Sequence, residues 1–164
     1  MSTGAWIALA AVVLALAFGL WRAATDGRFR GTHAVRGQVG PRVEEGAPRS
    51  LVEEGAPAPV TRPPGAELVA AVGATLGERA TLLQFSSAFC APCRATRRVL
   101  GEVTGLVEGV AHVEVDAEHH LDATRTFGVL RTPTTIVLDA RGAEVTRASG
   151  APTRDQVLTA LASV

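Results

Sequence analysis

The stretch "LLQFSSAFCAPCRATRRVL", residues 82 to 100, contains the only two cysteines of the chain, Cys90 and Cys93. An apolar run precedes the pair and a helical pattern follows it, which predicts a buried strand leading into a helix. A cysteine at a helix start is favoured as a thiolate, because unpaired N–H groups and the helix dipole stabilise negative charge there. Three arginines add positive charge within two turns: Arg94, Arg97 and Arg98.

The spacing of the cysteines favours reversible disulfide chemistry. Cys93 lies one helical turn after Cys90 and faces the same side, so the two sulfurs can bond to each other. We therefore predict that Cys90 is the nucleophile and that Cys93 closes the disulfide. Two alternatives stay open at this point: a buried, inert pair, and a metal site completed by two of three histidines, His112, His119 and His120.

The sequence on either side of the cysteines alternates between helical and strand patterns. Strands are predicted at 80–85, 110–116, 134–139 and 143–149, and helices after Gly65, at 91–107, at 119–127 and after Thr153. Thr153 and Gln156 form the sequence of a capping box at the last helix. This alternation predicts an α/β fold with helices on both faces of a sheet.

Three segments in this order resemble the thioredoxin family: "LLQFSSAFCAPCR", "VAHVEVDAE" and "FGVLRTPTTIVLDARG". The resemblance covers residues 66–164. It implies a thioredoxin-like fold, with a central mixed sheet flanked by helices, and thiol–disulfide exchange. The redox group is then the Cys90–Cys93 disulfide itself, without another cofactor or a metal. The resemblance also implies that Pro133 is a cis-proline facing the cysteines and that four residues contact the substrate: Phe89, Ala91, Pro92 and Thr132.

Two departures from the family pattern concern proton transfer. Gln84 stands where thioredoxins bury an aspartate, and His112 stands where they have a lysine. Glutamine cannot take a proton, whereas the ordinary pKa of histidine suits proton transfer. We therefore consider Gln84 and His112 as a possible proton relay, with a hydrogen-bonded strand histidine as the open alternative for His112.

An apolar run at residues 5–21 predicts a transmembrane helix. Gly4 to Trp21 spans roughly 27 Å as a helix, close to the thickness of a hydrocarbon core. Trp6 and Trp21 bracket the run, as interfacial tryptophans do. A cleaved signal peptide is the alternative; it is disfavoured because no lysine or arginine precedes Ala5.

Residues 22–64 are rich in proline, glycine, glutamate and arginine and predict a flexible linker to a domain at 65–164. Four arginines follow the apolar run: Arg22, Arg28, Arg30 and Arg36. By the positive-inside rule they place the domain in the cytoplasm, with the extracytoplasmic side left open. Three other arginines are expected to be solvated surface charges: Arg125, Arg131 and Arg147.

The combined prediction is a single-pass, membrane-tethered oxidoreductase that reduces protein disulfides and acts as a monomer. Its partners are the lipid bilayer and an external reductant, such as a thioredoxin reductase or a membrane thiol carrier. The net charge of zero gives no reason to expect nucleic acid as a partner. The alternatives are an exported thiol reductant of the TlpA or cytochrome-maturation type, a non-catalytic binding module and a metallochaperone.

Overall fold

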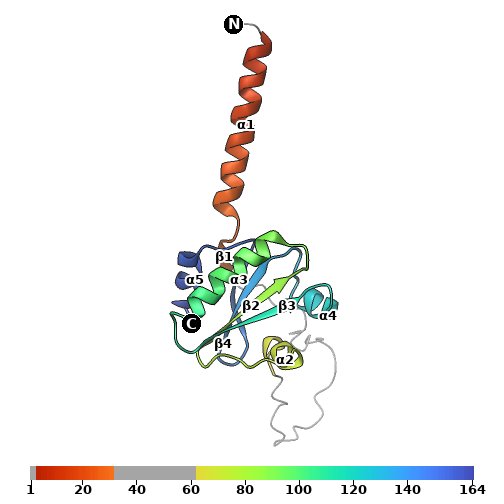
Figure 1. Cartoon of the computed structure of the whole chain (residues 1–164), viewed down its shortest axis with the longest axis vertical. Coiled ribbons are helices and arrows are strands. Elements are labelled where there is room, and N and C mark those ends of the chain that lie inside the picture. Colours follow the sequence, from red (N-terminus) through yellow and green to blue (C-terminus); the bar gives the residue numbers. More distant parts are fainter. Residues whose placement is uncertain (1–2, 32–61) are drawn as a thin grey trace, which may run out of the picture.

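The computed structural model describes residues 3–31 and 62–164, as one long helix and an α/β domain (Figure 1). The helix is α1 (Thr3–Thr25), and β1 (Phe29–Gly31) follows it closely. The other elements, in chain order, are α2 (Pro64–Ala71), β2 (Ala80–Ser86), α3 (Ala91–Thr104), β3 (Val110–Asp116), α4 (Leu121–Thr126), β4 (Thr134–Asp139), β5 (Glu144–Ser149) and α5 (Arg154–Leu161).

The strands form one mixed sheet in the order β1-β5-β4-β2-β3. β3 runs parallel to β2, and the other neighbouring pairs are antiparallel. From α2 onward, the order of helices and strands is the one predicted from the sequence, and the predicted α/β fold with a central mixed sheet is confirmed.

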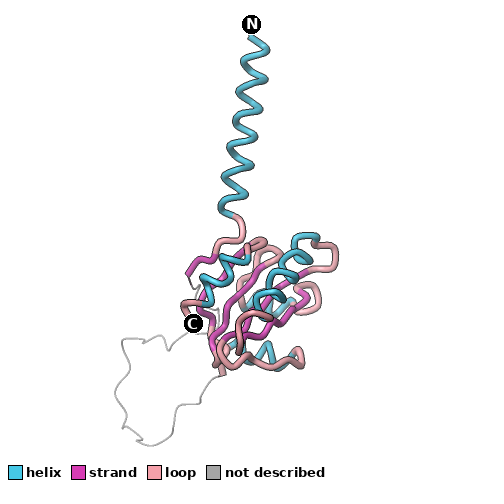
Figure 2. Tube along the Cα trace, turned by 60° about the vertical axis from the view of Figure 1, so that its left-hand side comes forward, coloured by secondary structure: helices cyan, strands magenta, loops and turns pink. Residues whose placement is uncertain are grey.

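Helices cover both faces of the sheet, as Figure 2 shows with the strands between the helices. Alternate side chains of the central strand β2 point to opposite faces. Leu82 packs in one apolar cluster with side chains of α3 and α5. Leu83 and Phe85 pack in a second cluster on the other face, with side chains of α2. Because β2 is buried on both faces, its sequence is a nearly continuous apolar run. Packing on both faces also holds β2 in place beneath the cysteine loop.

The structure differs from the predicted linker at its beginning. Helix α1 continues to Thr25, and residues 29–31 form β1, which pairs with β5 in register Phe29↔Ala148 to Gly31↔Thr146. Gly27 also donates its backbone N–H to the Ser149 carbonyl at 3.0 Å. A three-residue strand has too short a pattern to be recognised from sequence. Most of the predicted linker, residues 32–61, lies outside the described residues.

Arg147 is not the solvated surface charge that we expected. Its side chain is only 9% exposed and forms an ion pair with Glu144, whose side chain is 3% exposed. Arg147 Nη1 also donates to the Phe127 carbonyl at 2.6 Å. Arg125 is a surface charge as expected, with its side chain 74% exposed beside Asp122.

Candidate active site

Cys90 and Cys93 are joined in a disulfide, with their Cα atoms 5.2 Å apart. Cys90 is half-buried at the position before α3, and Cys93 is buried in the first turn of that helix. The turn brings both sulfurs to one side, as the two-residue spacing predicted. Cys90 is therefore the more exposed residue of the pair and Cys93 the shielded one, which is the asymmetry that a nucleophile and a resolving thiol need.

The start of α3 directs a backbone donor at Cys90. Cys90 Sγ accepts a hydrogen bond from the Cys93 N–H at 3.1 Å and so acts as the N-cap of the helix. Ala91 and Pro92 form the exposed first turn, where proline removes no helical hydrogen bond. When the disulfide is reduced, the same N–H and the helix dipole stabilise negative charge on Cys90.

A second loop comes beside the cysteine loop because β4 pairs with β2. Phe85 lies opposite Thr134 in the sheet, so Thr132 and Pro133 arrive next to the residues that follow β2. The Thr132–Pro133 peptide bond is cis, as the family resemblance implied. Ser87 Oγ and Thr132 Oγ1 are 3.2 Å apart and form a hydrogen bond that connects the two loops. No pattern in the sequence singles out Ser87.

Two large apolar side chains are fully exposed on the loops around the disulfide. Phe89, directly before Cys90, is 98% exposed, and Leu130, close to Thr132, is 97% exposed. Their position favours contact with a partner molecule at this end of the domain.

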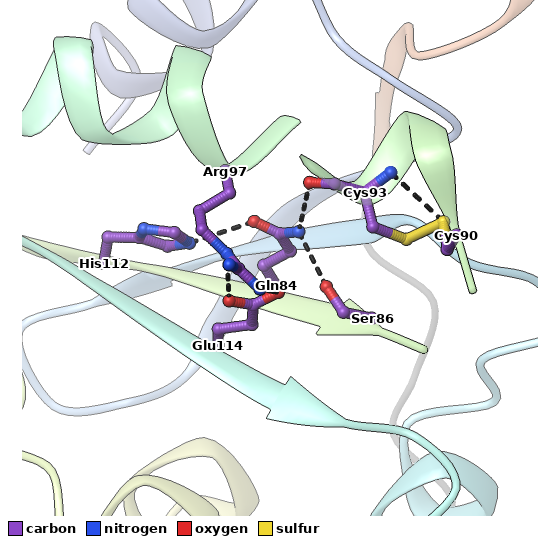
Figure 3. Close-up of polar contacts among 7 residues, drawn as sticks. All are labelled: Gln84, Ser86, Cys90, Cys93, Arg97, His112 and Glu114. Carbon is purple, nitrogen blue, oxygen red and sulfur yellow. Dashed lines mark hydrogen bonds and ion pairs between the residues drawn. A yellow bond between two sulfur atoms is a disulfide. The ribbon is translucent and has the colours of Figure 1, made fainter. Parts of the chain in front are cut away.

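Gln84 connects the buried strand to the cysteine helix (Figure 3). Its Nε2 donates to the Cys93 carbonyl at 3.1 Å and to Ser86 Oγ at 2.7 Å. Its Oε1 lies 3.0 Å from His112 Nε2. Because an amide oxygen only accepts, His112 must donate from Nε2. The neutral ring is therefore the tautomer that carries its proton on Nε2 and none on Nδ1. The structure therefore brings Gln84 and His112 together, and Gln84 contacts the cysteines through the backbone of Cys93.

Replacing Gln84 with glutamate tests whether this position can take part in proton transfer. We expect Gln84→Glu to speed the release of the mixed disulfide by about tenfold or more, because a buried carboxyl has a raised pKa and can accept the thiol proton. Single-turnover kinetics on a disulfide substrate measure the rate, with Gln84→Leu as the control of similar size. A rate that is unchanged or slower in Gln84→Glu removes this position from the proton path.

The stability of the domain is expected to depend on pH through His112. Its burial, partly opposed by the charge of Glu114, holds the pKa of His112 below the ordinary value of 6.5. The unfolded chain then binds the proton more readily than the folded chain. The contribution of His112 to stability is therefore full above pH 6.5 and is lost as the pH falls from that value through its folded pKa.

We expect His112→Gln to be less sensitive to acid than the parent chain between pH 7 and 5. The difference in slope is at most about 1.4 kcal/mol per pH unit for one group. Denaturant unfolding at several pH values measures this slope, and His119→Gln, at an exposed histidine, is the control. Equal slopes for His112→Gln and the parent would contradict the role of His112.

An ion pair that the sequence did not reveal lies beside the disulfide. Arg97 Nη2 donates to Glu114 Oε1 at 2.8 Å, and Arg97 Nε lies 2.5 Å from Glu114 Oε2. Partial burial alone would raise the pKa of Glu114, but hydrogen bonds from Arg97 and Ser86 and the charge of Arg97 hold it below its ordinary value. Arg97 is thus neutralised in part by Glu114 and adds less positive charge near Cys90 than its sequence position suggested.

A pocket of about 430 Å³ opens between this ion pair and the cysteines. Both cysteines line it, together with Arg94, Arg97 and Glu114. The pocket gives water a path to the side of the disulfide, and its charged walls favour polar groups over apolar ones. Within residues 3–31 and 62–164, no group of three or more His, Cys, Asp or Glu side chains is arranged to hold a metal ion.

Comparisons with known proteins point to one family. Residues 69–163 match the family model described as Thioredoxin. Thioredoxin H2-1 of Oryza sativa subsp. japonica is 36% identical over 70 residues, which are 43% of this chain and 50% of that protein. The chain thus spans about half the length of this curated relative.

Two solved structures are also similar. Thioredoxin NaTrxh from Nicotiana alata is 26% identical, with 52% of this chain and 73% of that chain covered and a TM-score of 0.48. A mutant thioredoxin from Halobacterium salinarum NRC-1 is 20% identical, with 52% and 74% covered and a TM-score of 0.49.

Proposed function

The chain belongs to the thioredoxin family, and we propose that it is a membrane-anchored thiol–disulfide oxidoreductase that reduces protein disulfides. The observation that carries the proposal is the Cys90–Cys93 disulfide at the start of α3, with Cys90 Sγ accepting the Cys93 N–H at 3.1 Å. The more exposed Cys90, the shielded Cys93 and the helix start together suit exchange with a disulfide of another protein.

The reaction proceeds through two exchanges of sulfur bonds. The Cys90 thiolate attacks one sulfur of the substrate disulfide, and the other substrate sulfur leaves as a thiolate and takes a proton. Cys93 loses its proton and attacks Cys90, which releases the second substrate sulfur and forms the Cys90–Cys93 disulfide. Two electrons have then passed to the substrate, and its two sulfurs have taken up one proton from Cys93 and one from water. A second dithiol, from a thioredoxin reductase or a membrane thiol carrier, restores the reduced pair.

The loops around the disulfide are proposed to hold the substrate. Phe89 and the exposed turn formed by Ala91 and Pro92 offer an apolar surface beside the reactive sulfur. Thr132 and Pro133 form the opposite side of the site, connected to the cysteine loop through Ser87. The extended backbone of a substrate would lie between these two loops.

Helix α1 supports the proposal of a membrane anchor. Gly4–Arg22 has a mean hydropathy of 2.2 and none of it is buried in the described structure. A signal sequence can share this length and composition. The anchor is favoured because α1 continues unbroken to Thr25 and leads directly into a strand of the domain. A helix that is apolar on every side is stable in a bilayer and not in water.

The arginines after α1 favour a cytoplasmic position for the domain, as the positive-inside rule predicts. Thiol labelling of intact cells with a membrane-impermeant reagent, after mild reduction, tests this position. Labelled Cys90 and Cys93 would put the domain outside and favour the exported TlpA or cytochrome-maturation type of reductant.

Insulin reduction by the full chain in detergent, driven by dithiothreitol, tests the proposed activity. We expect catalysis above the rate of dithiothreitol alone. A chain that binds proteins through the Thr132–Pro133 loop but gives no catalysis would instead be a non-catalytic binding module.

A further inference from the structure

The end of the membrane helix and the redox site lie at the same edge of the sheet. β2 ends beneath the cysteine loop, and Phe85 near its end pairs with Thr134. Thr134 pairs with Ser149 at the end of β5, and the preceding β5 residue, Ala148, pairs with Phe29 at the start of β1. This row runs across the sheet from β2 to β1, so α1 leaves the domain at the edge where β2 ends and the cysteine loop begins. Figure 1 shows α1 leaving the domain at its upper side.

Contacts directly after α1 join the anchor to the Thr132–Pro133 loop. Asp26, the first residue after the helix, forms an ion pair with Arg131 at 2.7 Å. Arg131 also donates to the Ser149 carbonyl at 2.6 Å, and Gly27 donates to the same carbonyl at 3.0 Å. Gly150 packs so closely that a Cβ built on it would lie 2.4 Å from Asp26 Oδ1. We name residues 26–31 the strap.

The strap leaves little room between the bilayer and the domain. The candidate span ends at Arg22, and Asp26 follows four residues later, directly after the last residue of α1, which is a rise of about 6 Å. The headgroup layer is itself about 5 to 8 Å thick on each side. Arg131, in contact with Asp26 and next to Thr132, therefore lies close to the outer surface of the headgroups. Leu130, 97% exposed, is on the same loop.

Resting on the proposed function, we propose that the redox site works at the membrane surface and that its partner is an integral membrane protein with a disulfide close to the bilayer. A long flexible tether would let the site reach soluble proteins on all sides, but β1 attaches the domain directly behind the helix. Residues 32–61 come after this attachment in the chain and so do not set the distance between the anchor and the domain. Phe89 and Leu130, both almost fully exposed, lie on the two loops at this end of the domain and are available to such a partner.

The chemistry passes two electrons to the membrane partner. Cys90 bonds to one partner sulfur while the other leaves and is protonated, and Cys93 then bonds to Cys90 and frees the second partner sulfur, which is also protonated. A soluble dithiol, dithiothreitol in the test, reduces the Cys90–Cys93 disulfide again.

Vesicles that hold the full chain and a single-span peptide with a disulfide loop test this proposal. In one peptide the disulfide follows the span after a few residues, and in the other a rigid helical spacer raises it by about 40 Å, beyond the height of a domain of this size. We expect the short peptide to be reduced at least about tenfold faster than the long one. Equal rates, or a faster long peptide, would overturn the proposal.

Two insertion variants distinguish the effect of the strap from that of the later linker. Both carry the same flexible 20-residue segment, which has a mean length of about 25 Å. Placed between Thr25 and Asp26, the segment keeps the strap contacts and frees the domain, so the two peptides should be reduced at rates within about threefold of each other. Placed between Gly46 and Ala47, it should leave the tenfold preference unchanged. The reverse pattern would overturn the role of the strap.

Insulin reduction in detergent separates this inference from the proposed function. The parent chain and both insertion variants should reduce insulin at equal rates, because no insertion touches the site. Normal insulin reduction with no preference between the peptides overturns the membrane-surface inference alone. Absence of insulin reduction in the parent chain contradicts the proposed function and this inference with it.

Discussion

Cys90→Ser is expected to lower insulin reduction by the full chain more than about a thousandfold, to the rate of dithiothreitol alone. Serine keeps the size and the cap position of Cys90, but its hydroxyl is not ionised near neutral pH and cannot form the mixed disulfide. The helix start remains in place because a serine oxygen accepts the Cys93 N–H well. Turnover in detergent measures the loss, and circular dichroism confirms that the variant is folded.

Cys93→Ser distinguishes the two sulfurs. Cys90 can then still attack, but the mixed disulfide has no internal thiol to release it. We expect this variant to accumulate a covalent complex with the substrate that dithiothreitol reverses, and Cys90→Ser to form none. Complexes in Cys90→Ser, or full turnover in either variant, would contradict the assigned roles.

Arg147→Met is expected to have the largest effect on stability, a loss of about 3–5 kcal/mol in the free energy of unfolding. Methionine fills similar space but leaves the carboxylate of Glu144, 3% exposed, without its partner. It also removes the donor at 2.6 Å from the buried Phe127 carbonyl. Denaturant unfolding followed by circular dichroism measures the loss, since both tryptophans lie in α1 and do not report on the domain.

The controls for Arg147 use a similar pair on the surface. Arg125→Met breaks the exposed ion pair with Asp122 and should cost less than about 1 kcal/mol. The double variant Glu144→Gln/Arg147→Met should recover part of the loss, because no buried charge is left uncompensated. If Arg147→Met and Arg125→Met lowered the free energy of unfolding by similar amounts, the buried ion pair would contribute no more to stability than the exposed one.

The cysteine loop could be predicted from sequence because each local signal there agrees with the others. The buried run of β2, the cap position of Cys90 and Pro92 in the first turn all specify the same strand-to-helix junction, and the observed α3 begins at that junction. Residues joined by long-range contacts gave no such signal. Glu114 and Arg97 meet across β3 and α3, and neither position differs in sequence from an ordinary surface charge.

The strap shows the same limit for the chain after α1. Asp26 and Arg131 are 105 positions apart in sequence, and their contact depends on β1 joining the sheet at the β5 edge. Composition predicted a tether at residues 22–64, because proline, glycine and charged residues dominate the segment as a whole. Three residues within it nevertheless form β1 and join the chain after α1 to the sheet, which composition alone did not predict.

The most direct test of the central claim is the pH dependence of alkylation of Cys90 in the reduced Cys93→Ser chain. If the start of α3 stabilises a thiolate, half of the thiols will react as thiolates at a pH well below that of free cysteine, about 8.5. A midpoint at or above the value of free cysteine would contradict the account, because Cys90 would then have no advantage as a nucleophile.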